Sequence, residues 1–497
     1  MIILFEVLLW LVVLLIAGSI YWYVTIPRGL PPGPAGLPFF GSAIEYWDGS
    51  KQHLALIENV KKYGPIFKLY IANKLVVVLG NYELIQEALV KQGDMFSGRP
   101  AMETFIPEKI RRLGVIMSEG DLWKEQRRFA LSALRDFGVG RPIIEPRIKE
   151  EIEYLNERIT EYANTSAPLN PQRLVTCAVS NIINQLLFGR RFSYDDDEFV
   201  RQFTSLSQRS SGDGVSFLSP FMLSETAARL VSILPIGQKM KAEGDDFLDF
   251  VEKELKKTSS TFDPDSEPTN YIHAFMKTAS SIKGDSYFTN SQLLAVCNDL
   301  FQAGTETTST TIRWAILYLA HHQDIQEKMY HEIKNQVGTT SLPNYADRTK
   351  LPFTEAVIME TQRLSNLVPL GVLRRTLAPT KLMGYDIPQD TLVLPLLINI
   401  LHNPDIYPEP HKFNPERFLD ANGKVIRDPK LIPFQAGKRV CLGEPLARME
   451  LFLFLVGLVS RFHFYFPSGQ FKPTVEPVIG FTCTPAAYEV CIELRND

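Results

Sequence analysis

The hydrophobic pattern opens with one long apolar run and continues with shorter helical and strand-like periods. Residues 1–24 are nearly all apolar, and Glu6 is the only charged residue among them. This length is close to the ~20 residues that a helix needs to cross a bilayer. Tyr21, Trp22 and Tyr23 lie at the far end, where aromatic side chains favour the lipid headgroup interface. The pattern therefore predicts a membrane-spanning helix.

A cleaved signal peptide is the competing interpretation, because residues 17–19 (Ala-Gly-Ser) can serve as a cleavage site. No Lys or Arg precedes the apolar run, however, and the run continues past that site. We favour a retained anchor over residues 1–26. A proline-rich hinge over residues 27–40 is expected next, since the prolines between Pro31 and Pro38 forbid a helix and stiffen the chain.

After the hinge, the pattern is mostly helical. Two apolar runs, Ile66–Ile71 and Leu75–Leu79, are separated by three residues and predict a β-hairpin. Strand-like runs return near the carboxyl end, at Thr391–Ile398 and Phe462–Phe466. The longest proline-free helical run is Thr289–His322, which predicts a helix of about 50 Å at ~1.5 Å per residue.

Two other segments are defined by their composition. Val215–Gly237 is apolar but is interrupted by Pro220 and Pro235, so it is too broken to span a membrane. It is either buried core or an apolar surface that enters a bilayer, and the sequence leaves both open. Lys256–Asn270 contains two prolines and many polar residues, and it is expected to be a loop.

Composition and charge argue against several classes of partner and site. The hydrophobic content of 45% allows a large core, and the formal net charge of −4 gives no reason to expect a nucleic-acid partner. The five cysteines show no C-x-x-C spacing, which disfavours a zinc site, and a disulfide framework is not expected in a chain this long. We expect a reducing compartment for the catalytic body.

The stretch Phe434–Gly443 combines a cysteine with features that suit ligand binding. Lys438 and Arg439 precede Cys441, and Pro445 suits the first turn of a following helix. Positive charge and a helix amino terminus both favour a thiolate over a thiol. Glycines on either side leave room for a large flat ligand to approach the backbone.

The complete pattern F-x-x-G-x-R-x-C-x-G resembles the haem-binding signature of the cytochrome P-450 superfamily. The resemblance implies that Cys441 is the axial thiolate ligand of haem b iron and that Arg439 pairs with a haem propionate. Phe434 is then placed to shield the sulfur from water. The resemblance also implies the family fold, mainly α with small β-sheets, for one haem-thiolate monooxygenase domain over residues 41–497.

The expected long helix carries Ala-Gly-Thr-Glu-Thr-Thr at residues 303–308. Ala303 and Thr307 are four residues apart, so a small side chain and a hydroxyl share one face. Gly304 and the run of hydroxyls weaken the helix and favour a local bulge. The stretch resembles the family's A-G-x-[DE]-T-T oxygen-binding motif, which implies that Ala303 lies beside the haem, Thr307 holds dioxygen and Glu306 relays protons.

Trp123 and Arg127 form a W-x-x-x-R element, whose indole N–H and guanidinium project from adjacent turns of one helix. Both groups can bind a carboxylate, and arginine does so bidentately. The element resembles the one that binds haem propionates in the family. The resemblance to microsomal members adds Arg99 and Arg374 as further contacts.

Three residues are expected to have a structural role. Glu360 and Arg363 can pair on one helix face, since they are three residues apart. With Pro-Glu-Arg-Phe at 415–418, they resemble the family's E-x-x-R helix and its partner, in which Arg417 completes a buried triad.

Two surfaces are expected from the resemblance. Arg128, Arg135, Lys438 and Arg448 resemble the basic cluster that meets an acidic flavoprotein reductase, although such a cluster is usually a solvated face. An apolar pocket is expected to favour a hydrophobic small-molecule substrate. Its lining would be Phe301, Ala303, Thr307, Val368, Leu370 and Phe481.

We expect a membrane-anchored haem-thiolate monooxygenase, most similar to the microsomal family-2 branch. The implied electron route runs from NADPH through a reductase, with cytochrome b5 as a further partner. The implied location is the endoplasmic reticulum membrane, with a single span and a cytosolic catalytic domain. The alternatives are a haem-thiolate isomerase or dehydratase acting on a lipid peroxide, and a non-catalytic haem-binding protein. The substrate itself is not identified by the sequence.

Overall fold

The computed structural model describes residues 27–495 apart from 38–39, 47, 101–103, 211–224, 468 and 470–471, together with residues 6, 10, 13, 16–18 and 24. Most of the predicted anchor therefore lies outside the described residues. Within the part that is described, no helix is both long and apolar enough to cross a membrane.

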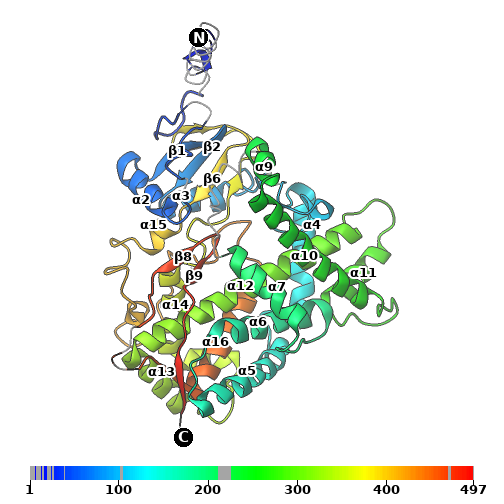
Figure 1. Cartoon of the computed structure of the whole chain (residues 1–497), viewed down its shortest axis with the longest axis vertical. Coiled ribbons are helices and arrows are strands. Elements are labelled where there is room, and N and C mark those ends of the chain that lie inside the picture. Colours follow the sequence, from blue (N-terminus) through cyan, green and yellow to red (C-terminus); the bar gives the residue numbers. More distant parts are fainter. Residues whose placement is uncertain are drawn as a thin grey trace.

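Helices form most of the molecule (Figure 1). The shorter segments are α3 (Tyr82–Ile85), α15 (Ile398–Leu401), a π-helix at Gln86–Lys91, and 3-10 helices at Glu108–Ile110, Pro142–Ile144, Tyr345–Lys350 and Pro415–Phe418. The longer helices are α2 (Gln52–Tyr63), α4 (Gly120–Asp136), α5 (Glu145–Thr165), α6 (Pro171–Phe188), α7 (Asp197–Ser210), α9 (Glu225–Ser232), α10 (Pro235–Ser259), α11 (Tyr271–Ser281), α12 (Asn290–His321), α13 (Gln323–Gln336), α14 (Pro352–Ser365) and α16 (Glu444–Arg461).

The largest sheet described has the strand order β1-β2-β6-β3, and Figure 1 shows it at one end of the helical body beside α2 and α3. The predicted hairpin is confirmed, because β1 (Ile66–Ile71) and β2 (Lys74–Leu79) are antiparallel with Ile66 opposite Leu79. β6 (Leu392–Pro395) runs parallel to β2, and β3 (Arg374–Arg375) is antiparallel to β6. The paired strands elsewhere are β4 (Thr380–Leu382) with β5 (Tyr385–Ile387), β7 (Phe462–Tyr465) with β10 (Cys491–Leu494), and β8 (Pro477–Ile479) with β9 (Cys483–Pro485).

Helix α12 crosses the middle of the molecule and packs most extensively against α6 (Figure 1). Its predicted start is confirmed, since the Thr289 side chain caps it by accepting from the Gln292 N–H at 3.2 Å. The expected bulge is absent, and the segment around Gly304 is α-helical. The Thr307 hydroxyl donates to the carbonyl of Ala303 at 2.7 Å, so this hydroxyl is satisfied inside an intact helix.

The triad of Glu360, Arg363 and Arg417 forms as predicted. Arg363 donates to both carboxylate oxygens of Glu360 at 2.7 and 2.8 Å, and Arg417 Nε donates to Oε1 at 3.1 Å. The backbone N–H of Asn414 adds a fourth bond at 2.9 Å. Glu360 and Arg363 are fully buried. The triad therefore ties α14 to the segment around residue 415, and none of its three residues is among the described lining residues of the cavity reported below.

The structure decides between the two interpretations of one segment and corrects the bounds of another. Of Val215–Gly237, residues 215–224 lie outside the described part; in the rest, Leu230 and Ile233 are 63% and 68% exposed. This described portion is therefore a largely exposed apolar surface and not buried core. The predicted loop over Lys256–Asn270 begins later than expected, because α10 continues to Ser259.

Candidate active site

Cys441 is held in a loop that leads directly into α16. Its backbone N–H donates to the carbonyl of Phe434 at 3.1 Å, and the helix begins at Glu444, one residue before Pro445. Gly437 has φ +77°, and a Cβ there would lie 1.8 Å from the carbonyl oxygen of Leu89. Gly437 is therefore required by this backbone contact, which differs from the predicted role of making room for a ligand.

The two basic residues that precede Cys441 in the sequence form their contacts with other groups and not with the thiol. The Lys438 ammonium pairs with Asp94, and the Arg439 guanidinium donates to backbone carbonyls. Burial raises the pKa of the Cys441 thiol, whereas the backbone N–H groups of Gly443 and Glu444 and the charge of Arg127 lower it. The helix amino terminus therefore favours the thiolate as predicted, but Lys438 and Arg439 do not.

Cys441 lines a central cavity of about 410 Å³. The cavity lies between α12, the cysteine loop and the start of α16, and its walls are mostly apolar. Arg99, Arg127, Ala303, Glu306, Thr307, Val368, Phe434, Arg439, Cys441 and Phe481 are the predicted site or pocket residues among its lining.

Two predicted pocket residues lie in the core instead. Phe301 is fully buried, and its ring centre is 5.5 Å from that of Phe247 and 5.6 Å from that of Phe203. Leu370 is 4% exposed and packs into the core formed with strands β1 and β2. The expectation that these two side chains face substrate is therefore wrong, because each is enclosed by neighbours from distant segments.

Four arginines lie close together beside the cavity. Arg99, Arg127 and Arg439 line it, whereas the predicted residues Arg374 and Trp123 are not among its described lining residues. Burial and the nearby guanidiniums lower the pKa of Arg99 to about 10 and that of Arg439 to about 8, and they hold the pKa of Arg374 well below its usual value. Burial also lowers the pKa of Arg127, against the opposing effect of Cys441. Buried cations that repel one another are unfavourable unless an anion accompanies them. The cluster is therefore suited to an anionic group of a ligand.

Hydrogen bonds fix these arginines in place. One arginine N–H donor and one nearby indole N–H donor nevertheless have no described partner. Arg439 donates to the carbonyls of Ser97 at 3.0 Å and Ser118 at 2.6 Å. Arg374 donates to Gln435 Oε1 at 2.8 Å, while its Nη1 has no hydrogen-bond partner among the described residues. The indole Nε1 of Trp123 is likewise buried and without a described acceptor. Two buried donors thus accompany the cationic cluster and need an acceptor.

Arg127 and Arg99 complete this side of the cavity. Arg127 donates to the carbonyl of Val440, next to the cysteine, at 2.7 Å. Arg99 donates to the carbonyls of Ile116 at 2.8 Å and Leu373 at 2.7 Å. The predicted W-x-x-x-R element is helical, since Trp123 and Arg127 both lie on α4.

Glu306 lies on α12 with its side chain buried at the edge of the cavity. It is 5% exposed and accepts a hydrogen bond from the Thr310 hydroxyl at 3.1 Å. Burial raises the pKa of Glu306 to about 7, against the opposing effects of Arg313 and of the hydrogen bond from Thr310. An acid with such a pKa can both hold and release a proton at neutral pH.

Sequence reasoning missed Asp299, which also lines the cavity. Its carboxylate accepts from the backbone N–H groups of Val115 at 2.7 Å and Ile116 at 2.9 Å, and burial raises its pKa to about 7. Asp299 lies four residues before Ala303, on the same face of α12. That spacing was visible in the sequence and could have identified it.

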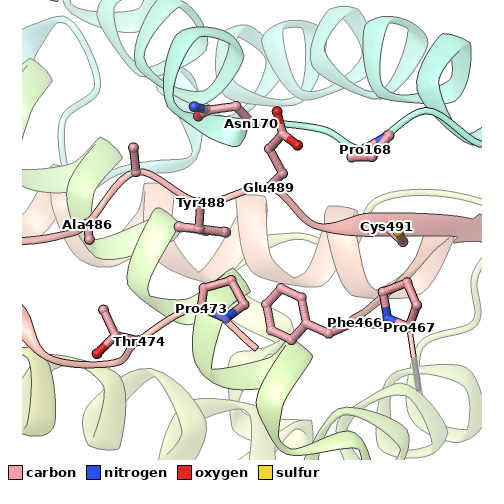
Figure 2. A pocket seen from close by; sticks show the side chains of 11 residues that line it. Pro168, Asn170, Phe466, Pro467, Pro473, Thr474, Ala486, Tyr488, Glu489 and Cys491 are labelled. Atoms are coloured by element: carbon pink, nitrogen blue, oxygen red, sulfur yellow. The ribbon is translucent and has the colours of Figure 1, made fainter. Parts of the chain in front are cut away.

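A second hollow of about 630 Å³ lies among segments near the carboxyl end (Figure 2). Figure 2 shows Pro168 and Asn170 on one side and Phe466, Pro467 and Pro473 on the other. None of the predicted site residues is among its described lining residues. The central cavity is therefore the candidate active site, because it is lined by the cysteine, by arginines and by the buried acid Glu306.

The predicted basic cluster is partly neutralised. Arg128 and Arg135 are exposed on α4. Arg448 pairs with Glu444 at 2.9 Å, and Lys438 pairs with Asp94. Two of the four charges therefore have carboxylate partners, which weakens the field that the sequence alone suggested.

A thiol at a helix amino terminus, facing a mostly apolar cavity that is also lined by buried arginines, is the kind of site that a haem-thiolate protein has. Comparison with known families agrees, because the cytochrome P450 family model matches residues 31–492. The chain is 39% identical to cytochrome P450 2H1 of Gallus gallus over 476 residues, which cover 94% of each chain. It is 36% identical to cytochrome P450 2D26 of Rattus norvegicus, covering 94% of this chain and 93% of the rat protein. It is 37% identical to cytochrome P450 2B19 of Mus musculus, covering 93% of each.

The chain therefore belongs to the cytochrome P450 family, and it is a haem-thiolate monooxygenase similar to family-2 members. The residues present fit haem. The Cys441 thiol supplies a ligand atom of the kind that haem iron accepts, and the buried donors of Trp123 and Arg374 lie with cations that suit propionates.

Proposed function

We propose that this monooxygenase inserts one atom of O₂ into an apolar substrate, a fatty acid, steroid or xenobiotic, with electrons from NADPH delivered by a flavoprotein reductase. The observation that carries the proposal is that Cys441, Glu306 and Thr307 line one cavity with mostly apolar walls. A cavity of this kind favours hydrophobic ligands and excludes bulk water. When bound, haem b supplies the oxygen-activating redox chemistry.

The proposed roles follow from the positions of the side chains. Cys441 is the iron ligand, shielded by Phe434, and the N–H groups at the start of α16 stabilise its anion. Arg99, Arg127, Arg374 and Arg439, with the Trp123 N–H, hold the two propionates. Ala303 leaves space beside the flat face of the haem.

Proton delivery is assigned to α12. Glu306 carries a proton at the cavity edge, and the Thr307 hydroxyl lies one residue away in the same wall. Thr307 is proposed to orient dioxygen and to pass protons that Glu306 takes up from solvent. This acid and hydroxyl favour a monooxygenase over an isomerase or dehydratase that rearranges a peroxide, because the latter reaction consumes no external protons.

The location and partners are proposed from the same similarity. Residues 1–26 are assigned as a single-pass anchor in the endoplasmic reticulum membrane, residues 27–40 as a hinge and residues 41–497 as the cytosolic catalytic domain. The exposed basic residues on α4 support docking of an acidic reductase, and cytochrome b5 is a further candidate for the same face.

Reconstitution of the full-length protein with reductase and lipid vesicles tests the proposal. NADPH and O₂ consumption with hydroxylated or epoxidised products in a fatty-acid, steroid and xenobiotic panel is the expected result. Product formation without NADPH would instead indicate an isomerase or dehydratase. The reduced carbon monoxide spectrum should show thiolate ligation in wild type and lose it in Cys441→His. Haem binding with no product from the panel would favour a non-catalytic role.

A further inference from the structure

Gln302 brings an amide group to the central cavity, on the wall formed by α12. The side chain is half-buried, and its Nε2 donates to Oδ1 of Asn298, one turn earlier on the same helix, at 2.8 Å. Asn298 is 8% exposed, so this bond is largely shielded from solvent and holds the Gln302 amide in place. In a cavity with mostly apolar walls, a fixed amide is the kind of group that orients a ligand.

The Gln302 amide can form more hydrogen bonds than this one. A glutamine amide carries two N–H donors and one carbonyl acceptor, and one donor is used in the bond to Asn298. Rotating both amides by half a turn reverses the bond, and Gln302 then keeps both donors. In either arrangement, at least one N–H of Gln302 has no acceptor among the described residues and can donate to a ligand in the cavity.

Two hydroxyls of the same wall donate within the helix. The Thr307 hydroxyl donates to the carbonyl of Ala303 at 2.7 Å, and the Thr311 hydroxyl donates to the carbonyl of Thr307 at 2.8 Å. Both threonines line the cavity. Gln302 therefore offers this wall a hydrogen-bond donor that neither hydroxyl does.

The charges near Gln302 narrow the chemistry of the ligand. Asp299 lies three residues before Gln302 and Glu306 four residues after it, so both acids are its neighbours on the helix surface. A ligand carboxylate at Gln302 would be buried beside two acids without a counter-charge, since the arginines are assigned to the propionates. An ammonium group has no acceptor for the amide N–H. A neutral carbonyl has an acceptor and carries no charge.

We propose that Gln302 determines specificity for apolar substrates that carry a neutral hydrogen-bond acceptor, typified by a ketone, by donating its amide N–H to that group. The inference rests on the proposed function and narrows its substrate class, favouring ketones over free fatty acids, alkanes and cationic amphiphiles. Asn298 is a positioning residue that holds the amide. Because the bond fixes one end of the substrate, the same carbon is presented for oxidation in each turnover.

The test uses ligands of similar chain length: n-dodecane, 2-dodecanone, dodecanoate and dodecyltrimethylammonium. The dissociation constant of each ligand is measured without NADPH from the shift of the Soret band of the haem-loaded full-length protein. Mass spectrometry after addition of NADPH and reductase identifies which carbon is oxidised. The variants are Gln302→Leu, Gln302→Met and Asn298→Leu. Gln336→Leu is the matched control, because Gln336 is exposed at the end of α13 and is not among the described lining residues of the cavity.

Wild type should bind 2-dodecanone more tightly than the other three ligands. Gln302→Leu should weaken binding of the ketone roughly three- to tenfold, the effect of losing one neutral hydrogen bond, and should leave binding of the alkane unchanged or tighter. Its products from the ketone should be oxidised at more positions than those of wild type. Gln336→Leu should match wild type in every measurement.

The two other variants separate specificity from folding. Gln302→Met keeps an unbranched side chain of similar length without the amide, and it should repeat the result of Gln302→Leu. It decides the matter if Gln302→Leu loses haem. Asn298→Leu leaves the Gln302 amide present but unheld, so the ketone should bind more weakly by a smaller factor and the oxidised positions should again increase.

An unchanged ratio of ketone to alkane binding in Gln302→Leu and Gln302→Met, beside normal wild-type turnover, would overturn the inference and leave the proposed function standing. Tighter wild-type binding of dodecanoate or dodecyltrimethylammonium than of the ketone would do the same. A wild-type protein that binds the ketone through Gln302 but forms no product from the series or from the wider substrate panel would instead overturn the proposed function. Binding measured without NADPH and turnover measured with it distinguish these failures.

Discussion

The guanidinium carbon of Arg439 lies 3.8 Å from the centre of the Trp123 indole ring. Trp123 lies on α4 and Arg439 lies in the cysteine loop. Their contact places a buried cation against an aromatic face. It holds the indole in a position where Nε1 is buried without a described acceptor. The pair therefore joins the helix to the loop and leaves one donor for a ligand.

Replacing Trp123 with Phe should weaken haem retention while preserving the stack on Arg439. The lost donor would have faced a charged propionate, and such a bond contributes about 1.5–3 kcal/mol, or on the order of tenfold or more in affinity. The haem dissociation rate, followed with a haem-scavenging protein, measures the effect. Trp123→His keeps an N–H donor and should retain more haem than Trp123→Phe. Equal haem dissociation rates for wild type and Trp123→Phe would show that Trp123 does not bind a propionate.

Glu360→Ala should strongly destabilise the fold. The change removes the shared acceptor of Arg363, Arg417 and the Asn414 N–H, and it leaves buried guanidiniums without a counter-charge. Breaking a buried pair in this way costs about 3–5 kcal/mol. Asp195→Ala, which removes the exposed partner of Arg158, is the control and should cost at most about 1 kcal/mol. Chemical denaturation compares them, and similar losses would argue against a special role for the triad.

The raised pKa of Glu306 predicts a pH-dependent stability. The folded protein binds this proton more tightly than the unfolded chain does, because burial raises the pKa from 4.5 to about 7. Protonated Glu306 therefore adds its full contribution to the unfolding free energy below about pH 4.5. This contribution, about 3 kcal/mol, is lost as the pH rises through 7. Glu306→Gln should flatten the fall in unfolding free energy between pH 5 and 7. An unaltered slope would mean that Glu306 is ionised in the folded protein.

Asp299 should contribute in the same direction, since burial raises its pKa from 3.8 to about 7. Asp299→Asn combined with Glu306→Gln is therefore expected to leave less pH dependence than either change alone. The measurement is again the unfolding free energy at pH 5, 6 and 7. Equal slopes for the double variant and Glu306→Gln would show that Asp299 keeps an ordinary pKa.

Lys438→Glu should slow reduction by the flavoprotein without loss of haem, on the order of tenfold at low salt if its charge meets an acidic partner. The variant also sets two carboxylates together, because Lys438 pairs with Asp94. The exchange Lys438→Glu with Asp94→Lys restores the local pair and should recover part of the rate. Lys253→Glu on α10, at a similar exposed pair with Glu198 of α7, is the control. Haem loss matching the rate loss would indicate a structural role for Lys438.

Much of the local structure was accessible from the sequence. Helix α12, the β1–β2 hairpin and the Glu360–Arg363 pair were predicted with bounds correct to within a residue or two. Each depends on interactions between neighbouring residues: the 3.6-residue period, the cap at Thr289, or two side chains one turn apart. The order of residues is sufficient to define such features.

The directions of side chains were decided by the tertiary structure. Lys438 turns to Asp94 and Arg439 to carbonyls more than 300 positions away, so neither acts on the thiol as the local sequence suggested. Phe301 is enclosed by phenylalanines from other helices, and Leu370 by strand residues. The sequence by itself determined the helix periods, the capped ends and the thiol ligand loop. Which charges are buried, and what they face, depends on segments that meet only on folding.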